Sequence, residues 1–201
     1  MKTKRLLLII SFLALLPLLS FAQEKPKLQY AVGFGLSHDS MNLLYGLNFT
    51  NELNFGLGKR TSLNAGLTFY QSLGNYEKSS LLMGQKSKEQ YSGIFITPSF
   101  KYDIIQSKSG FNLAIAAGPS LQLGGETFLF NAYPYGSESP YPTYVTNKYQ
   151  RVGLFLELEA EWNSKNPNRR NAVSLSAFGA NNAMPWYLHA TYKVRFKLGK
   201  K

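Results

Sequence analysis

The sequence predicts an all-β protein, an eight-stranded antiparallel up-and-down transmembrane β-barrel with a packed polar interior. The first observation behind this prediction is a set of eight runs in which apolar and polar residues alternate with a period of two, with no helical pattern between them. The second is that the short and the long connections between these runs fall at opposite ends. An even number of strands lets the sheet close with both chain ends on one side.

Residues 151–162 form the clearest of the eight runs. The leucines and Trp162 share one side of an extended strand and the charged residues share the other, because successive strand side chains point to opposite faces. As a helix, the same residues would mix glutamate and leucine around the whole circumference. The period therefore indicates a strand with one apolar and one charged face.

The other seven runs keep the same alternation. In chain order, each with two of its apolar residues, the predicted strands are 28–37 (Tyr30, Phe34), 43–57 (Leu47, Phe49), 61–72 (Leu63, Leu67), 91–104 (Ile94, Ile96), 111–123 (Ile115, Leu121), 151–162 (Leu154, Leu156), 171–180 (Val173, Leu175) and 186–198 (Leu188, Val194). Turn-forming residues separate them, which favours a meander of hairpins.

Two features interrupt the alternation. Asn51 falls on the apolar side near the middle of its strand, where a β-bulge could redirect it. Pro98 and Pro119 cannot donate to a strand ladder, and both lie about eight residues from their shared turn. We therefore expect the two prolines at similar height on neighbouring strands, with a bulge or a non-hydrogen-bonded site there.

The polar faces carry charges of both signs. An eight-stranded barrel has an interior just wide enough for side chains, so these charges would lie in a packed core rather than line a pore. Buried charges are costly unless they are paired. A soluble sheet with a solvated charged face is the alternative that the pattern leaves open. The predicted internal acid–base network consists of Glu157, Glu159, Glu161, Lys193, Arg195, Lys197, Lys101, Asp103 and Arg151.

Residues 1–22 have the three parts of a secretory signal peptide. A basic start precedes an apolar run from Leu6 to Leu19, and a small-x-small cleavage site follows at 20–22. The apolar run is shorter than the roughly 20 residues that a spanning helix needs. We therefore predict export, and one mature domain, the outer-membrane β-barrel, over residues 23–201.

The connections predict how the barrel is oriented. If the termini are periplasmic, the connections at 58–60, 105–110 and 163–170 are periplasmic and short or medium. The long connections, 74–90 and 124–148, then both lie outside, as is usual in outer-membrane barrels. Four tyrosines of the second long connection are candidates for recognition, because exposed aromatic residues suit binding, although an aromatic belt is an equal alternative. These tyrosines are Tyr133, Tyr135, Tyr141 and Tyr144.

The composition argues against several functions. The formal net charge is +11, but no basic face with interleaved aromatic residues occurs, so we predict contact with anionic lipid or a polar interior rather than with nucleic acid. There is no cysteine and there are only two distant histidines, so we predict no metal site and no cofactor. His38, Asp39 and Ser40 offer a base, an acid and a hydroxyl, but adjacent residues in a turn rarely converge into a triad. We predict no catalytic residue.

Short motifs resemble a known family. Residues 95–102 resemble the I-P-x-x-x-K-Y strand of the small outer-membrane β-barrel domain of Bacteroidota, the PorT-like group, and 118–121 resemble its G-P-x-L strand. The Ala22-Gln23 junction and residues 192–196 are similar too. This resemblance implies an OmpA-like eight-stranded barrel in the cell outer membrane, in contact with outer-membrane lipid and the outer-membrane assembly machinery. It implies location and fold rather than an activity.

Together these patterns predict an integral outer-membrane β-barrel protein with a structural or binding role through its long outer loops, without an open pore and without enzymatic activity. An unknown protein or glycan is the expected kind of further partner. Two alternatives stay open. An outer-membrane lipid A-modifying enzyme would use His38, or His189 with Thr191, whereas a soluble periplasmic β-barrel ligand carrier would enclose an apolar cavity.

Overall fold

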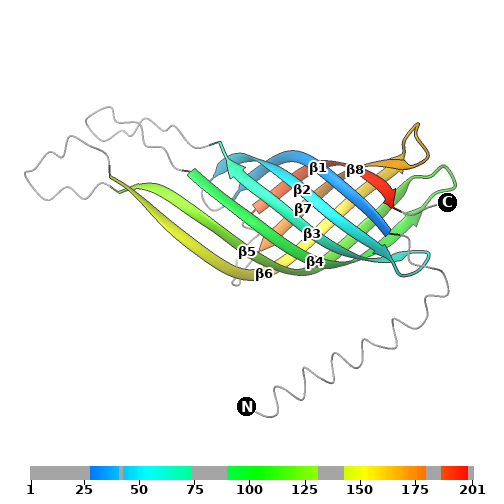
Figure 1. The fold of residues 1–201 in the computed structure, drawn as a ribbon, viewed down its shortest axis with the longest axis horizontal. Helices are drawn as coiled ribbons and strands as arrows, with labels where there is room; N and C mark the ends of the chain where they lie inside the picture. Colours follow the sequence, from blue (N-terminus) through cyan, green and yellow to red (C-terminus); the bar gives the residue numbers. More distant parts are fainter. Residues whose placement is uncertain (1–27, 41–42, 74–89, 131–142, 180–186, 199–201) are drawn as a thin grey trace, which may run out of the picture.

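The computed structural model describes residues 28–40, 43–73, 90–130, 143–179 and 187–198. They form eight antiparallel strands that pair in chain order and close into one barrel (Figure 1). The strands are β1 (Leu28–Asp39), β2 (Leu44–Gly56), β3 (Thr61–Ser72), β4 (Gln90–Gln106), β5 (Asn112–Phe130), β6 (Thr143–Asn163), β7 (Arg169–Gly179) and β8 (Tyr187–Leu198). The predicted signal peptide, residues 1–22, lies outside the described residues.

The register fixes how strongly the strands tilt. Followed from partner to partner once around the barrel, Leu28 on β1 returns through Leu188 on β8 to His38, ten residues further along the same strand. A stagger of this kind requires the strands to tilt against the barrel axis. Eight tilted strands enclose a space that side chains can fill.

The two faces of the wall have opposite polarity, as the alternation predicted. On β6, the side chains of Leu154 and Leu156 are 69% and 58% exposed, whereas Glu159 is 1% exposed and faces the interior. Large hydrophobic side chains are exposed on every one of the eight strands. No helix in the described part of the chain is long and apolar enough to cross a membrane.

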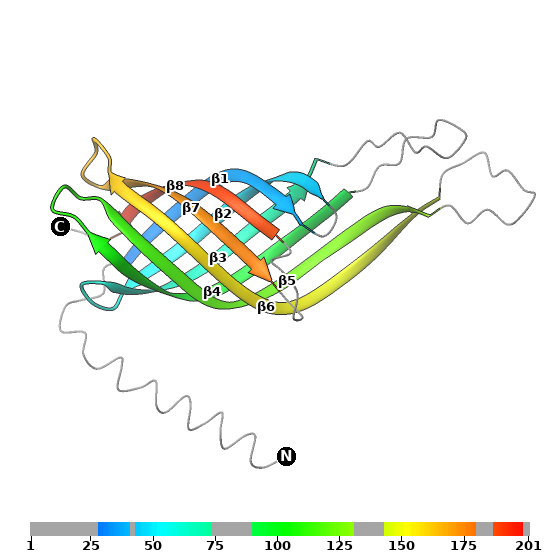
Figure 2. The same ribbon diagram turned by 180° about the vertical axis from the view of Figure 1, so that it is seen from behind.

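The two ends of the barrel differ. The connections 57–60, 107–111 and 164–168 lie at the end where β1 starts and β8 stops, which we call the turn end (Figures 1 and 2). Segments 74–89 and 131–142 connect strands at the opposite end, the loop end. This arrangement agrees with the predicted sorting of short and long connections.

The hairpin of β5 and β6 is longer than predicted. Its strands stay paired as far as Phe130 and Thr143, beyond the last β4 partner at Thr127 and the last β7 partner at Leu154. In both views it projects past the other strands at the loop end (Figures 1 and 2). A two-stranded ribbon outside the barrel has no inside and outside to separate, so its sequence lacks the alternation that marks the other strands.

The two predicted irregularities have different outcomes. The bulge at Asn51 was wrong, because Asn51 stays in register with Val32 and Leu67, and its side-chain oxygen accepts a hydrogen bond of 2.6 Å from the Tyr30 hydroxyl. The shared height of the two motif prolines is confirmed. The β4–β5 pairs stop at Ile96↔Leu121 and resume at Phe100↔Ala117 in unchanged register, so Pro98 lies opposite Pro119. A register shift lies nearer the turn, between Asp103 and Ile105. Gly118 allows the close approach there, since a Cβ would lie 2.0 Å from the Pro98 carbonyl oxygen.

Candidate functional site

The turn-end half of the barrel interior holds a network of eight ionised side chains. Four carboxylates and four cations are joined by ion pairs, so the formal charges of the set cancel. We call this set the charge network. Its members are Glu52, Lys101, Glu157, Glu159, Glu161, Arg170, Lys193 and Arg195.

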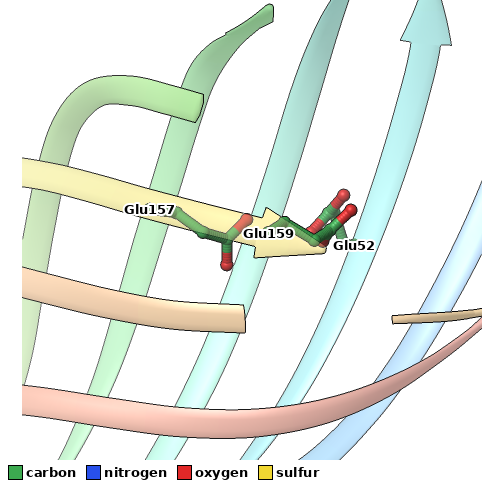
Figure 3. Close-up of side chains that lie close together, drawn as sticks. All are labelled: Glu52, Glu157 and Glu159. Atoms are coloured by element: carbon green, nitrogen blue, oxygen red, sulfur yellow. The ribbon is translucent and has the colours of Figure 1, made fainter. Parts of the chain in front are cut away.

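Lys193 on β8 lies at the centre of the network. Its Nζ is 2.9 Å from Glu52 Oε2, 2.6 Å from Glu157 Oε2 and 3.1 Å from Glu159 Oε2. An ammonium group has three protons to donate, so each proton has a carboxylate acceptor. Glu52 comes from β2, and Glu157 and Glu159 come from β6 (Figure 3). In the closed barrel, β2 and β6 each lie two strands away from β8, in opposite directions.

Arg195 and Lys101 extend the network towards the turn end. Arg195 Nη2 is 3.0 Å from Glu52 Oε1 and 2.9 Å from Glu159 Oε1, so the guanidinium joins β2 to β6. Lys101 on β4 donates to Glu159 as well. Glu159 is therefore bound by cations from β4 and β8, and such pairing makes buried charges tolerable in a low-dielectric interior.

The edge of the network is closed by Arg170. Its Nε is 2.5 Å from Glu161 Oε1, and its Nη2 donates a hydrogen bond of 2.7 Å to the Gly110 carbonyl oxygen in the β4–β5 turn. Arg170 thus ties the start of β7 to β6 and to a neighbouring turn.

Three carboxylates of the network come close enough together to resemble a cation site. One oxygen each of Glu52, Glu157 and Glu159 lies within 4.8 Å of the others (Figure 3). The Lys193 ammonium contacts all three carboxylates and supplies the positive charge that they need. The geometry therefore describes an ion cluster built from the chain's own side chains, and gives no support to a resident metal ion there.

The network differs from the sequence prediction at its edges. Lys197 is exposed and donates to the Pro167 carbonyl oxygen, and Asp103 lies at the turn end and accepts a hydrogen bond from Gln106. Arg151 lies at the loop end, where it pairs with Glu126 at 2.9 Å. These three residues are in the polar phase of their strands but beyond the buried length, and alternation specifies the face of a residue without specifying its depth.

The sequence analysis did not predict two members of the charge network, Glu52 and Arg170. Glu52 lies on the polar face of its predicted strand, so the alternation contained the signal, but no neighbouring charge in β2 drew attention to it. Arg170 was placed in a turn, because the strand was predicted to start at 171 rather than at Arg169.

The loop-end half of the interior contains a cluster of aromatic side chains among buried polar ones, which the sequence analysis did not predict. Phe95 lies with its ring centroid 4.6 Å from that of Phe178 and 5.1 Å from that of Tyr187. The signal was present, because these residues occupy the polar phase of strands that otherwise carry small or charged residues. The buried cluster consists of Leu44, Tyr70, Tyr91, Phe95, Ala116, Phe155, Phe178 and Tyr187.

Tyr149 on β6 covers this aromatic cluster from the projecting hairpin. Its hydroxyl lies 3.2 Å from the Tyr187 hydroxyl, and its ring lies across Gly124, where a Cβ would be 2.3 Å from the Tyr149 Cζ. The Arg151 guanidinium stacks over the Tyr149 ring, 4.1 Å from the ring centroid. Arg151 therefore packs against the cover of the aromatic cluster instead of joining the charge network.

A small cavity separates the two halves of the interior. It measures about 20 Å³ and is lined by threonines of β2, β3 and β4 together with Glu157, His189 and Lys193. A water molecule needs ~10–15 Å³ measured in this way, so the cavity has room for about one.

Replacing Phe95 with alanine is expected to lower the free energy of unfolding by about 3–5 kcal/mol, because Phe95 is fully buried and its removal leaves a cavity among aromatic rings. Urea unfolding of the protein folded into lipid vesicles, followed by tryptophan fluorescence, measures this loss. Phe95→Leu is the control, since it retains most of the volume and should cost less than ~1.5 kcal/mol. Equal losses for both variants would contradict the packing role.

The two histidines lie on opposite faces of the wall. His38 packs on Tyr45 on the outside, with ring centroids 4.8 Å apart, whereas His189 is buried inside among Tyr70, Phe95 and Phe178. Thr191 donates to Asn48 rather than to His189, and the expected hydrogen bond of His189 Nε2 is not found among the described residues. The side chains that the enzyme alternative would need therefore do not converge.

The remaining candidates fall partly outside the described residues. Tyr133, Tyr135 and Tyr141 are in segment 131–142, so their role in recognition stays a prediction. Tyr144 belongs to β6, where it is in register with Leu129.

Comparison with known proteins supports the fold. No protein-family model and no curated protein matches the chain. Among solved structures, Neisserial surface protein A (NspA) is similar, with 14% identical residues and a TM-score of 0.50 over 87% of this chain and 98% of that one. The N-terminal β-barrel domain of Pseudomonas aeruginosa OprF is similar with 11% identity and a TM-score of 0.52 over 87% of this chain and all of that one, 100%.

Fold and interior together define the class. The chain is a small eight-stranded antiparallel β-barrel of the architecture seen in outer-membrane proteins, apolar on the outside and ionised and aromatic on the inside.

Proposed function

We propose that this chain is an integral outer-membrane protein, exported by the signal peptide of residues 1–22 and inserted with its termini in the periplasm. Its long loop-end connections would then face the cell exterior and serve a structural or binding role, with outer-membrane lipid around the barrel and an unknown protein or glycan as partner. We also propose that the assembly machinery of the outer membrane inserts it, and that it belongs with the PorT-like barrels whose strand motifs it resembles.

One observation carries this proposal, namely the inverted polarity of the wall. Outward leucines such as Leu154 and Leu156 are more than half exposed, whereas eight ionised groups lie inside. A monomeric protein in water rarely exposes a continuous apolar surface of this extent. In a bilayer, the same surface meets acyl chains, and closure of the sheet leaves no free strand edge in the wall. One structural neighbour is named a surface protein, which agrees with this location.

The filled interior supports a role without an open pore. The charge network fills the turn-end half and the aromatic cluster fills the loop-end half, with a cavity of about 20 Å³ between them. The carrier alternative needed a large apolar cavity in the same place, and nothing in this interior favours it.

The proposal is tested by fractionation and by labelling of intact cells. The protein is expected in the outer-membrane fraction, released by detergent but not by salt or alkali. An epitope inserted after Leu82, in a long connection, is expected to bind antibody on intact cells. The same epitope after Lys59, in a turn at the opposite end, serves as the matched control and should bind only after permeabilisation.

Release of the protein without detergent would contradict membrane insertion. Labelling of the Lys59 epitope, but not the Leu82 epitope, on intact cells would show that the proposed orientation is reversed.

A further inference from the structure

The turn end of the barrel carries a ring of exposed cations. They come from all three turns and from the end of β8, so they surround the barrel rather than form one patch. We call this set the basic rim. Its members are Lys59, Arg60, Lys108, Lys165, Arg169 and Lys197.

Acidic residues do not balance the basic rim. Within the described chain, the acids at the turn end are Asp103, which is only partly exposed, and Glu161, which is buried and paired with Arg170. At the loop end, the described cations Lys148 and Arg151 are matched in number by Asp39 and Glu126, and Arg151 pairs with Glu126. Among the described residues, the excess of positive charge therefore lies at the turn end.

The basic rim adjoins the apolar outer surface. The Arg169 guanidinium lies over the Phe196 ring, 5.3 Å from its centroid. Trp162 on β6 lies near Tyr192 on β8, across β7, with ring centroids 6.5 Å apart. Aromatic residues of this kind mark the boundary between acyl chains and headgroups. Cations just beyond that boundary lie at the level of lipid phosphates.

We propose that the basic rim binds the anionic headgroups of phospholipids in the membrane leaflet at the turn end. This inference rests on the proposed membrane insertion and adds a selectivity to it. The chemistry is that of several Lys and Arg side chains around one phosphate-rich surface, each contact favouring an anionic over a zwitterionic headgroup. Because the outer wall is apolar as far as the turn end, the cations of the basic rim lie beside the headgroups of the adjacent lipids.

Trp162 provides the reporter for the test, because it lies on the outer face beside Arg169. The chain has two tryptophans, and Trp186→Phe leaves Trp162 alone. The single-tryptophan protein is folded into phosphatidylcholine vesicles that contain a minority of phosphatidylglycerol, and either lipid is brominated in turn. The expected result is quenching by brominated phosphatidylglycerol about fivefold stronger, per mole of lipid, than by brominated phosphatidylcholine at low salt, with the preference lost at high salt.

Two variants remove four positive charges each. In the rim variant, Lys59→Gln, Lys108→Gln, Lys165→Gln and Arg169→Gln are combined, and Lys197 is kept because it holds the Pro167 carbonyl. In the control variant, Lys78→Gln, Lys86→Gln, Lys88→Gln and Lys148→Gln are combined. The preference for phosphatidylglycerol is expected to fall to about one in the rim variant, and to remain in the control variant, because headgroup contacts act over a Debye length.

The outcomes separate the inference from the proposed function. Equal quenching by the two lipids, or a preference that survives in the rim variant, would overturn the inference while leaving insertion supported. Competition by soluble glycerol phosphate that abolishes the preference would also overturn it, because the rim would then bind a small anion. Absence of quenching by either lipid would contradict insertion itself.

Discussion

Lys193→Met is expected to lower the free energy of unfolding by about 3–5 kcal/mol, the largest effect of any single substitution in the charge network. Methionine fills a similar volume, so the loss comes from the charge. Glu52, Glu157 and Glu159 each lose a contact of 3.1 Å or less with the ammonium group, and the interior keeps one uncompensated negative charge. Urea unfolding in lipid vesicles measures the difference.

Two further variants test whether the charge is the cause. Lys197→Met changes an exposed lysine on the same strand and should cost less than ~0.5 kcal/mol. The double variant Lys193→Met with Glu157→Gln restores neutrality, because Glu157 forms its ion pair with Lys193 and its hydrogen bond with Ser176. We expect it to recover more than half of the loss. If Lys193→Met were as stable as the natural chain, the charge network could not exist as described.

Leu156→Arg is expected to destabilise the folded barrel in a bilayer by about 2–4 kcal/mol, because it puts a charge on the outer wall near mid-membrane. Leu156 is 58% exposed and pairs with Ala117 and Ala177 on neighbouring strands. In a barrel dissolved in water the same side chain would be solvated, and the substitution would change stability by less than ~0.5 kcal/mol.

Leu198→Arg is the matched control for depth. Leu198 is also exposed, but it ends β8 next to Lys197 at the turn end, where an arginine can reach the headgroups. Its cost should be about 0–1 kcal/mol. A similar cost for both variants, measured by urea titration in vesicles, would mean that the outer wall does not lie in hydrocarbon.

The alternation of side chains predicted the fold almost completely, because a period of two assigns each residue to a face. It identified eight strands, their order, and the interior direction of Glu159 and Lys193. It could not give depth, so Lys197 and Asp103 were counted as interior although they lie at the turn end. The alternation also gave no prediction where strands extend beyond the barrel wall, as in the β5–β6 hairpin.

The sequence could not predict which interior side chains contact one another, and the reason is geometric. Glu52 and Arg195 are 143 residues apart, and only closure of the sheet places β8 beside β1, so that its side chains reach those of β2. The aromatic cluster has the same origin, since Phe95, Phe178 and Tyr187 meet only across the enclosed space. Pairing of this kind depends on the stagger of the whole barrel, which no single stretch encodes.

The position of Lys193 and Arg195 has a consequence for how the molecule is made. Both belong to the last strand, and until it arrives, a nascent sheet of seven strands contains the four carboxylates with only Lys101 and Arg170 to neutralise them. Such an intermediate has two surplus negative charges facing inward and resists burial. The last strand therefore completes the neutralisation of the charge network, and a chain truncated before β8 is expected to be less stable in the membrane than the full chain.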